Sequence, residues 1–171
     1  MTQQSDMTKV FDTMRSGLAI VTTAYRRKPA GCTCTWISRV SFEPPLVAVF
    51  LAPKRSTLET IRKGKRFAIN ILAEDSLELA RRFGFSSAEG QDRFADLNYV
   101  TGESGAPILR DALSYLDCRL ESITALGDHE MVLGRVQDAA IQRPDTPAVY
   151  DPGTFFVSNE AIAEHNEAQH G

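Results

Sequence analysis

One cluster of polar side chains has the composition of an anion-binding site. It follows the apolar run LVAVFL and combines two cations with two hydroxyls: Lys54, Arg55, Ser56 and Thr57. If a helix begins there, its unpaired N-terminal amides would join these side chains in binding an anion such as a terminal phosphate. The alternative is that Ser56 only caps the helix.

A second cluster consists of small hydroxyl residues on a β-branched stretch. Its members are Thr33, Thr35, Ser38 and Ser41. On a strand, such short donors and acceptors can line a flat polar heterocycle together with main-chain amides. The alternative is a solvated sheet face, because threonine is common in strands. The presence of the anion-binding cluster nearby favours the first interpretation.

The cysteines suggest packing rather than chemistry. Cys32, Cys34 and Cys118 are too few, and odd in number, for a disulfide framework, and reduced thiols fit the cytoplasm. Cys32 and Cys34 would point to the same face of a strand, and with Cys118 and His129 they could form a metal site. A single C-x-C pair is weak evidence for a metal, so we expect small-residue packing and predict no bound metal.

Length, charge and hydropathy exclude several classes of protein. The 171 residues are 43% hydrophobic and 24% charged, which suits one domain with one core. A net charge of −3 gives no electrostatic attraction to a polyanion, so we expect no nucleic-acid partner. The longest apolar run covers residues 46–52, whereas a membrane span needs about twenty residues. The first ten residues lack the regions of a signal peptide, and we expect a soluble, cytoplasmic protein.

Hydrophobic periodicity predicts the elements that position these clusters. Helical spacing of Val10, Phe11 and Met14 predicts an amphipathic helix over residues 6–16. β-branched and aromatic runs predict strands over residues 18–25, 32–42, 46–51, 67–72, 113–124, 130–141 and 154–158, with a hairpin turn over 26–31. Because the strands outnumber the helices, we predict a mainly β fold, a closed antiparallel barrel with helical excursions.

Two short helices are predicted between the strands. Ser56 and Glu59 form an S-x-x-E pattern, which predicts a capping box for a helix that ends at Gly64. Asp75 is the predicted cap of the second helix. The core-facing residues of that helix should be Leu77, Ala80 and Phe83. The polar loop beyond it, residues 85–105, is long enough to suggest a function.

The stretch GCTCTWISRVSFEPPLV, residues 31–47, resembles the signature of the flavin reductase-like family of FMN-binding split barrels. Further segments similar to family motifs follow in the same order: residues 56–61, residues 66–72, D-R-F at 92–94, Cys118, and G-D-H with the later G-x-V at 127–136. The resemblance implies an antiparallel split β-barrel of Greek-key type over residues 1–157, followed by a C-terminal tail over residues 158–171.

The resemblance also implies which residues bind the flavin. The isoalloxazine ring and ribityl chain would contact Thr33, Cys34, Thr35, Ser38, Arg39, Val40 and Ser41. The phosphate would bind Ser56 and Thr57, which agrees with the anion-binding cluster that also contains Lys54 and Arg55. Arg39 stands where the family usually has a serine, and its guanidinium offers a phosphate more donors and charge than a hydroxyl would.

Several aromatic and basic residues carry two interpretations. The histidine of the family that matches His129 lies where the nicotinamide docks, so His129 is the predicted catalytic residue, with an exposed turn histidine as the alternative. Trp36 could stack on a ring, although a lone strand aromatic more often packs in a core. His165 and His170 lie in a polar tail and should be solvated. Three arginines could reach a pyrophosphate or decorate the surface: Arg81, Arg82 and Arg93.

The activity implied by the resemblance is that of an NAD(P)H-dependent flavin reductase. Such an enzyme transfers a hydride from NADH or NADPH to FMN, or to FAD, and supplies the reduced flavin to a partner monooxygenase. The resemblance further implies a homodimer. The alternatives are an FMN-binding flavoprotein with a different electron acceptor or no reductase activity, and a domain that binds no flavin. No G-x-G-x-x-G follows a strand, so the nicotinamide would bind in an open groove.

Overall fold

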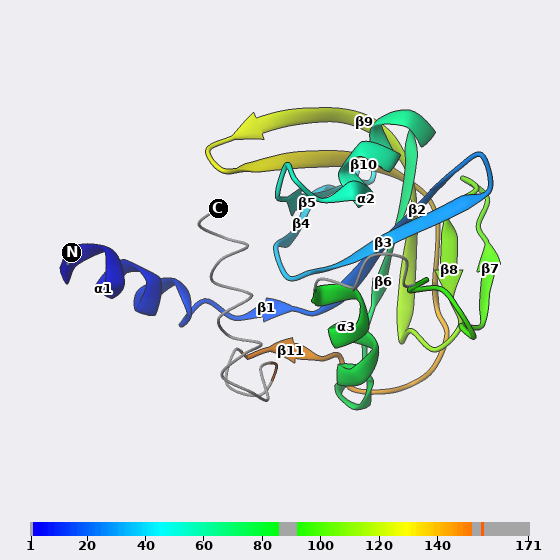
Figure 1. The fold of residues 1–171 in the computed structure, drawn as a ribbon. Coiled ribbons are helices and arrows are strands. Elements are labelled where there is room, and N and C mark those ends of the chain that lie inside the picture. Colours follow the sequence, from blue (N-terminus) through cyan, green and yellow to red (C-terminus); the bar gives the residue numbers. More distant parts are fainter. Residues whose placement is uncertain (1, 86–91, 152–154, 156–171) are drawn as a thin grey trace.

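A curved, antiparallel sheet forms the centre of the molecule (Figure 1). The structure is a computed structural model that describes residues 2–85, 92–151 and 155, and side chains from residue 6 onward. The strands of the sheet are β2 (Ala19–Tyr25), β3 (Lys28–Cys34), β4 (Ile37–Ser41), β5 (Leu46–Leu51), β6 (Arg66–Ile71), β9 (Ser114–Leu126) and β10 (His129–Ile141). They follow the order β3-β2-β6-β9-β10-β5-β4, and all neighbours are antiparallel.

Short strands and helices complete the described part of the chain. Two small sheets pair β1 (Ser16–Gly17) with β11 (Val149–Tyr150) and β7 (Tyr99–Thr101) with β8 (Pro107–Leu109). The helices are α1 (Thr2–Phe11), α2 (Ser56–Gly64), the 3-10 helix η1 (Glu74–Ser76) and α3 (Leu77–Gly84). Both α2 and α3 pack against β2 and β3. None of the described helices combines the length and the apolar character that a membrane crossing requires.

Alternation along β2 divides the core into two clusters. Val21 points into the concave side of the sheet, where the largest cluster also contains Phe67 and Cys118. Ile20 points to the other side, into a cluster with Phe83 of α3. Ile20 and Val21 are both fully buried, as successive residues are when both faces of a strand are covered. The sheet is therefore held on both sides by apolar packing.

The mainly antiparallel β fold is confirmed, whereas closure of the barrel is not shown. β3 and β4 are the two end strands of the sheet, and no ladder joins them in the described residues. The two ends nevertheless approach each other where the chain passes from β3 to β4. There the Phe50 amide of β5 donates to the carbonyl of Trp36 at 3.0 Å.

The prediction of one continuous strand over residues 32–42 is wrong. The chain forms two strands that are interrupted at Thr35 and Trp36, because β3 pairs with β2 while β4 pairs with β5 at the opposite end of the sheet. The predicted turn over 26–31 is also too long. β3 begins at Lys28, and the turn consists of Arg26 and Arg27, both in the left-handed conformation.

The predicted capping box of α2 is wrong. The N-cap is Arg55, no side chain caps the helix in the described part of the chain, and Ser56 is the first helical residue. Glu59 instead accepts a hydrogen bond from Lys63 at 2.5 Å, one turn along the helix. An ammonium group is a stronger partner for a carboxylate than the backbone amide of the N-cap. The helix ends at Gly64 as predicted.

Asp75 is likewise not the cap of the second helix. It lies inside η1 and accepts hydrogen bonds from the Arg143 guanidinium, while the N-cap of α3 is Ser76. This bidentate pair ties η1 to the segment after β10. The predicted core side of the helix is confirmed, because Ala80 and Phe83 are buried and Leu77 packs against their cluster.

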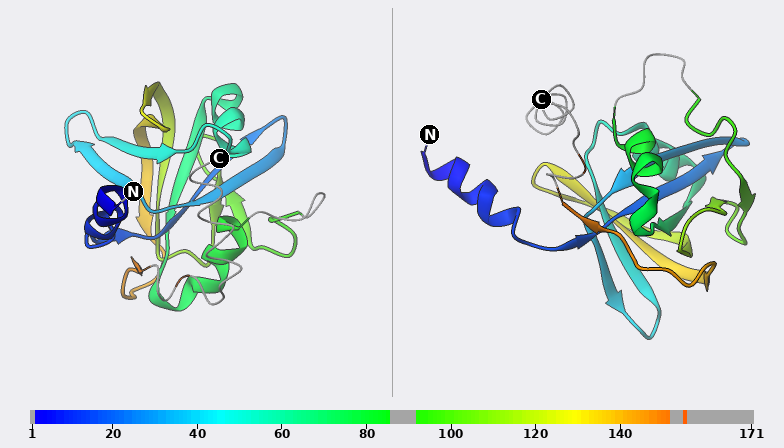
Figure 2. Two further views of the ribbon diagram at one scale, coloured as in Figure 1. Left: turned by 60° about the vertical axis from the view of Figure 1, so that its left-hand side comes forward. Right: turned by 90° about the horizontal axis from the view of Figure 1, so that it is seen from below.

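At the chain ends and in the long loop, the structure differs from the predictions or does not describe the residues concerned. The first helix is α1, which ends at Phe11 and stands away from the sheet, with Met14 exposed beyond it (Figure 2). The loop over residues 85–105 contains β7, and its residues 86–91 lie outside the described part. Of the predicted strand over 154–158 only Phe155 is described, and it is helical. The predicted tail, with His165 and His170, lies outside the described residues.

Candidate functional site

An exposed tryptophan on the link between β3 and β4 packs against a half-buried histidine of β10. Trp36 leaves the strand path at this link, and half of its surface, 51%, is exposed, so the interpretation of Trp36 as a core residue is wrong. The ring of His129, the first residue of β10, lies against it with centroids 4.4 Å apart and planes inclined by 36°. His129 is also held by its Nδ1, which lies 2.8 Å from the Asp128 carboxylate. We call this pair of rings the aromatic ledge.

Register brings the start of α2 close to the aromatic ledge. Leu51, the last residue of β5, pairs with Glu130, which follows His129 in β10. α2 begins at Ser56, only a few residues after β5 ends. From the other direction, Thr57 of α2 contacts the Cys32 thiol of β3. Both clusters singled out in the sequence therefore lie around one end of β3.

The residues of the anion-binding cluster have different surroundings. Lys54 and Ser56 are exposed, and Arg55 is half-buried with its Nη1 3.4 Å from the carbonyl of Gly84. Thr57 is buried, with its hydroxyl against the thiol of β3. Ser56 and the uncapped amides of α2 are thus the groups that an anion from solvent would meet, with Lys54 beside them.

Arg93, for which the sequence left open a phosphate contact or a surface position, adds a second guanidinium near Arg55. Its Nη2 donates to the carbonyl of Phe85 at 2.7 Å, and Nη1 lies 3.4 Å from the carbonyls of Gly31 and Phe83. Its Nε is buried and has no hydrogen-bond partner among the described residues. Burial, and then the charge of Arg55, lower the pKa of Arg93. In the sequence, Arg93 stood out only as the middle residue of the D-R-F motif at residues 92–94. That motif does not indicate that Arg93 lies close to Arg55.

The hydroxyl cluster is divided by the two faces of the strand. Thr33 lies on the outer side, where its hydroxyl donates to the carbonyl of Ala80 in α3 at 2.5 Å. Cys34 points inward, belongs to the main core and is 5% exposed. Thr35 is half-buried in the link. The structure therefore does not bring Thr33 and Cys34 to one surface, and their roles toward a ring stay predictions.

The rest of the hydroxyl cluster lies on β4, an edge strand that pairs only with β5 among the described strands. Ser38, Arg39 and Val40 are exposed, and Ser41 is half-buried beyond a bulge opposite β5. The Ser38 hydroxyl donates to the neighbouring carbonyl at 3.1 Å. An edge strand keeps half of its main-chain amides and carbonyls unpaired, so β4 can bind a polar ring through its backbone.

The three cysteines pack as apolar residues. All are free and buried in the same core cluster. Burial raises the pKa of Cys34 to about 12 and that of Cys118 to about 12, and it also raises the pKa of Cys32. These thiols are therefore protonated at neutral pH and are poor nucleophiles and poor metal ligands.

Comparisons with known proteins show to which family this chain is similar. Residues 11–158 match the family described as flavin reductase like domain. The chain is 34% identical over 145 residues to a high molecular weight rubredoxin of Moorella thermoacetica, covering 84% of this chain and 63% of that protein. It is 31% identical to the reductase subunit of a flavin-dependent monooxygenase of Rhodococcus jostii, covering 82% and 70% of the two chains.

A solved structure is similar over nearly the full length. The NADH:FAD oxidoreductase of Streptomyces globisporus superposes with a TM-score of 0.80 at 27% identity, covering 88% of this chain and 90% of that one. The chain spans less than two thirds of the Moorella protein and about a quarter of a diflavin flavoprotein of Nostoc. Since the family match extends over most of the sequence, this chain belongs to the flavin reductase like domain family.

Proposed function

We propose that this protein is an NAD(P)H-dependent flavin reductase that transfers a hydride from the nicotinamide to FMN, with FAD as a possible second flavin. The observation that carries the proposal is the position of the aromatic ledge, with its exposed Trp36, beside the cationic, uncapped start of α2. Cys32 contacts α2 and Trp36 lies four residues further on, a separation of about 13 Å along an extended chain. A ribityl chain with its phosphate can bridge such a distance.

The residues at the start of α2 fit a phosphate. Ser56 and the helix amides would donate hydrogen bonds to it, and Lys54 would supply charge. The buried, unpartnered Nε of Arg93, close to Arg55, is a further donor in the same neighbourhood. A second phosphate group, as FAD carries, would add an anion of the same kind, so this part of the site supports either flavin.

The residues at the β3–β4 link fit a flat ring. Trp36 offers an exposed aromatic surface backed by the half-buried His129, and the unpaired edge of β4 offers main-chain donors and acceptors beside it. Arg39 is exposed and lies over the ring of Phe42 at 5.9 Å, and because it pairs with Val47 of β5, on the side away from α2, we assign its charge to the ring edge along β4. This arrangement also supports the split-barrel architecture, in which the two sheet ends meet at the ligand.

A bound flavin supplies the hydride acceptor, so the protein needs to orient two rings rather than provide a nucleophile. The contact between Asp128 and Nδ1 fixes the imidazole plane of His129 and leaves Nε2 as the ring nitrogen for a ligand. We assign His129 the role of contacting the nicotinamide. The protonated, buried thiols take no part in this reaction.

The decisive experiment is oxidation of NADH and of NADPH under anaerobic conditions, with FMN, FAD and riboflavin compared side by side. Stoichiometric flavin reduction is expected, with FMN bound more tightly than riboflavin. If FMN binds and neither nicotinamide is oxidised, the protein is a flavoprotein with another electron acceptor. The similarity to a longer protein named as a rubredoxin supports that second candidate. If no flavin binds, both candidates fail.

The partners follow from the same comparison. The likeness to a monooxygenase reductase subunit supports delivery of reduced flavin to a partner monooxygenase. We also propose a homodimer, because three apolar side chains on α1 are exposed in the part of the chain that the structure describes: Met7, Val10 and Phe11. Sedimentation equilibrium measures the oligomeric state directly.

A cytoplasmic location, without nucleic-acid or membrane partners, agrees with the free cysteines and the net charge of −3.

A further inference from the structure

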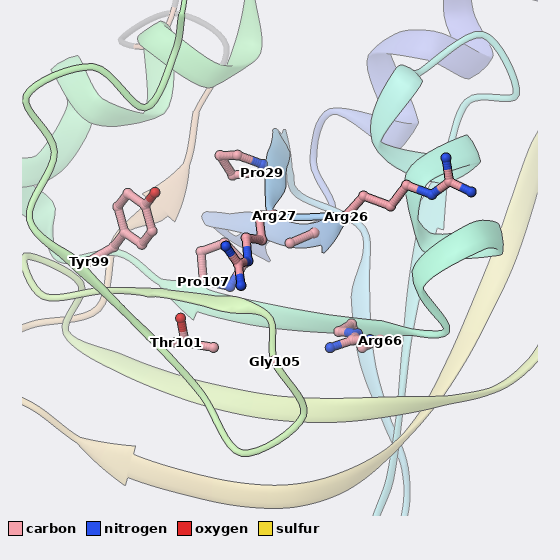
Figure 3. Close-up of a pocket in the computed structure, with 9 residues that line it drawn as sticks. Arg26, Arg27, Pro29, Arg66, Tyr99, Thr101, Gly105 and Pro107 are labelled. Carbon is pink, nitrogen blue, oxygen red and sulfur yellow. The ribbon is translucent and has the colours of Figure 1, made fainter.

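A basic cavity lies between the β2–β3 turn and the β7–β8 hairpin. These two segments lie at the opposite end of the molecule from the turn between β9 and β10 (Figure 1). The cavity has a volume of about 350 Å³, and its lining includes Arg26, Arg27, Arg66, Tyr99, Thr101 and Gly105 (Figure 3). α2 separates it from the proposed phosphate site, since the cavity lies beyond the end of this nine-residue helix, which is about 13 Å long. The cavity is thus not part of the flavin site.

Within the described residues, no carboxylate pairs with the two guanidinium groups that Arg27 and Arg66 bring to this cavity. Figure 3 shows the Arg27 guanidinium among the lining residues, with Tyr99 on one side and Arg66 on the other, while Arg26 extends away. None of the lining residues is acidic. In the described part of the chain, neither Arg27 nor Arg66 forms an ion pair with a carboxylate, although the whole protein carries a net charge of −3.

The arginines at this cavity occupy positions that are unfavourable for folding. Arg26 and Arg27 have φ values of 49° and 64° in a two-residue turn where Asn-Gly is the usual sequence. Arg66 lies directly opposite Arg119 on β9, and like charges in that position destabilise a sheet. Glycine is required at position 105, where φ is +93° and a side chain would collide with the Arg66 guanidinium. The cationic groups thus remain at the cavity despite their cost to the fold.

The opposite wall of the cavity is aromatic and fixed. Tyr99 packs edge-on against Phe94, with ring centroids 5.5 Å apart and an interplanar angle of 76°. Arg66 is anchored at the other side, because its Nε donates to the carbonyl of Gly64 at 2.9 Å and leaves the terminal nitrogens for a ligand. Thr101 adds a hydroxyl between the two walls.

We propose that this cavity binds a phosphorylated compound with a flat ring, of the nucleoside monophosphate class. Arg27 and Arg66 would bind the phosphate oxygens, since guanidinium groups match phosphate in charge and geometry. Tyr99 would stack on the ring. A volume of about 350 Å³ lies at the lower end of the range for small-molecule sites and suits one nucleotide rather than a dinucleotide.

Calorimetric titration of the full chain with AMP, inorganic phosphate and adenosine tests this site. Saturating FMN is present throughout, so that the start of α2 is occupied. AMP should bind with 1:1 stoichiometry, phosphate more weakly and adenosine more weakly still. Arg27→Ala and Arg66→Ala should each weaken AMP binding at least tenfold. Arg15→Ala removes an exposed arginine outside the cavity and should change nothing.

Thermal unfolding of each variant establishes that it is folded before the titrations are compared. The proposal is overturned if AMP does not bind, or if its affinity is unchanged in folded Arg27→Ala and Arg66→Ala variants. Equal affinities for phosphate and AMP would overturn the nucleotide class. Loss of AMP binding in Ser56→Ala alone would place AMP in the flavin site and overturn the proposal as well. None of these readouts depends on flavin reduction.

Discussion

Similar polar side chains serve opposite purposes in two regions of the molecule. Between β2, β6 and β8, Asn70 donates to the carbonyl of Ile20 at 3.1 Å and to the Thr22 hydroxyl at 2.9 Å, and accepts from the Leu109 amide at 2.8 Å. At the start of α2, the Ser56 hydroxyl has no partner among the described residues. The polar groups of Asn70, which lie inside the core, are thus satisfied by internal hydrogen bonds. The Ser56 hydroxyl at the start of α2 is not, and it can therefore bind a ligand.

The largest effect that this comparison predicts is on stability. Asn70→Ala removes three hydrogen bonds and leaves the Leu109 amide buried without an acceptor. The free energy of unfolding should fall by about 3 kcal/mol, while the affinity for flavin stays unchanged. Urea unfolding measures the loss, and Asn98→Ala, at an exposed position, is the matched control. A stability loss as small as that of the control would mean that the network contributes little.

The reverse pattern is expected for Ser56→Ala. Losing one charge-assisted hydrogen bond should weaken FMN by about 1.5–3 kcal/mol, with little change in riboflavin affinity or in stability. Fluorescence titration with both flavins measures the difference. Thr60→Ala on the same helix is the control, because its hydroxyl is already bonded to the Ser56 carbonyl at 2.9 Å. Equal losses for FMN and riboflavin would contradict the phosphate assignment.

His129→Ala separates binding from reaction within the open region. Because His129 lies on the aromatic ledge and is proposed to contact the nicotinamide, hydride transfer should slow about tenfold or more, equivalent to about 1.4 kcal/mol. The affinity for oxidised flavin should stay within a few-fold. Stopped-flow flavin reduction at saturating NADH or NADPH is the measurement. An unchanged rate of flavin reduction would show that His129 is only a structural residue of the turn.

A smaller effect is expected at Cys34, a core residue next to the aromatic ledge. Its thiol lies 3.4 Å from the Trp36 carbonyl and its pKa is raised to about 12, so it stays protonated up to alkaline pH. Cys34→Ser should shift flavin affinity by about 1 kcal/mol and retain most activity. Iodoacetamide should modify the native thiol very slowly at pH 8. Rapid alkylation, or loss of activity on chelation that zinc restores, would show instead that the thiols are reactive or bind metal.

Local periodicity predicted most strands because the burial of a strand's residues depends on the pattern of apolar and polar residues along the strand itself. The runs that became β5, β6, β9 and β10 were located to within a few residues. The break at Trp36 was not predictable from propensity, because the residues on both sides favour strands and only the pairing of β3 and β4 with different neighbours interrupts them. The caps failed for a related reason, since Glu59 and Asp75 are engaged by cations rather than by helix amides.

The candidate site was predictable in its residue types and only partly in its geometry. The charge and hydroxyls before α2 predicted an anion site, and the family resemblance singled out His129; both assignments stay predictions. The burial of Thr57 and Cys34, the bond from Thr33 to α3, and the approach of Arg93 to Arg55 depend on packing between distant segments. The same holds for the cavity with Arg27 and Arg66, which residues more than thirty positions apart assemble.

A crystal structure of the protein with FMN tests the central claim most directly, namely that the open end of the sheet is the flavin site. The isoalloxazine ring should lie against Trp36, with its polar edge along β4 and with His129 at the face where the nicotinamide docks. The phosphate should contact Ser56 and the first amides of α2. A flavin bound away from the aromatic ledge, or with its phosphate in the cavity at the other end of α2, would contradict this account.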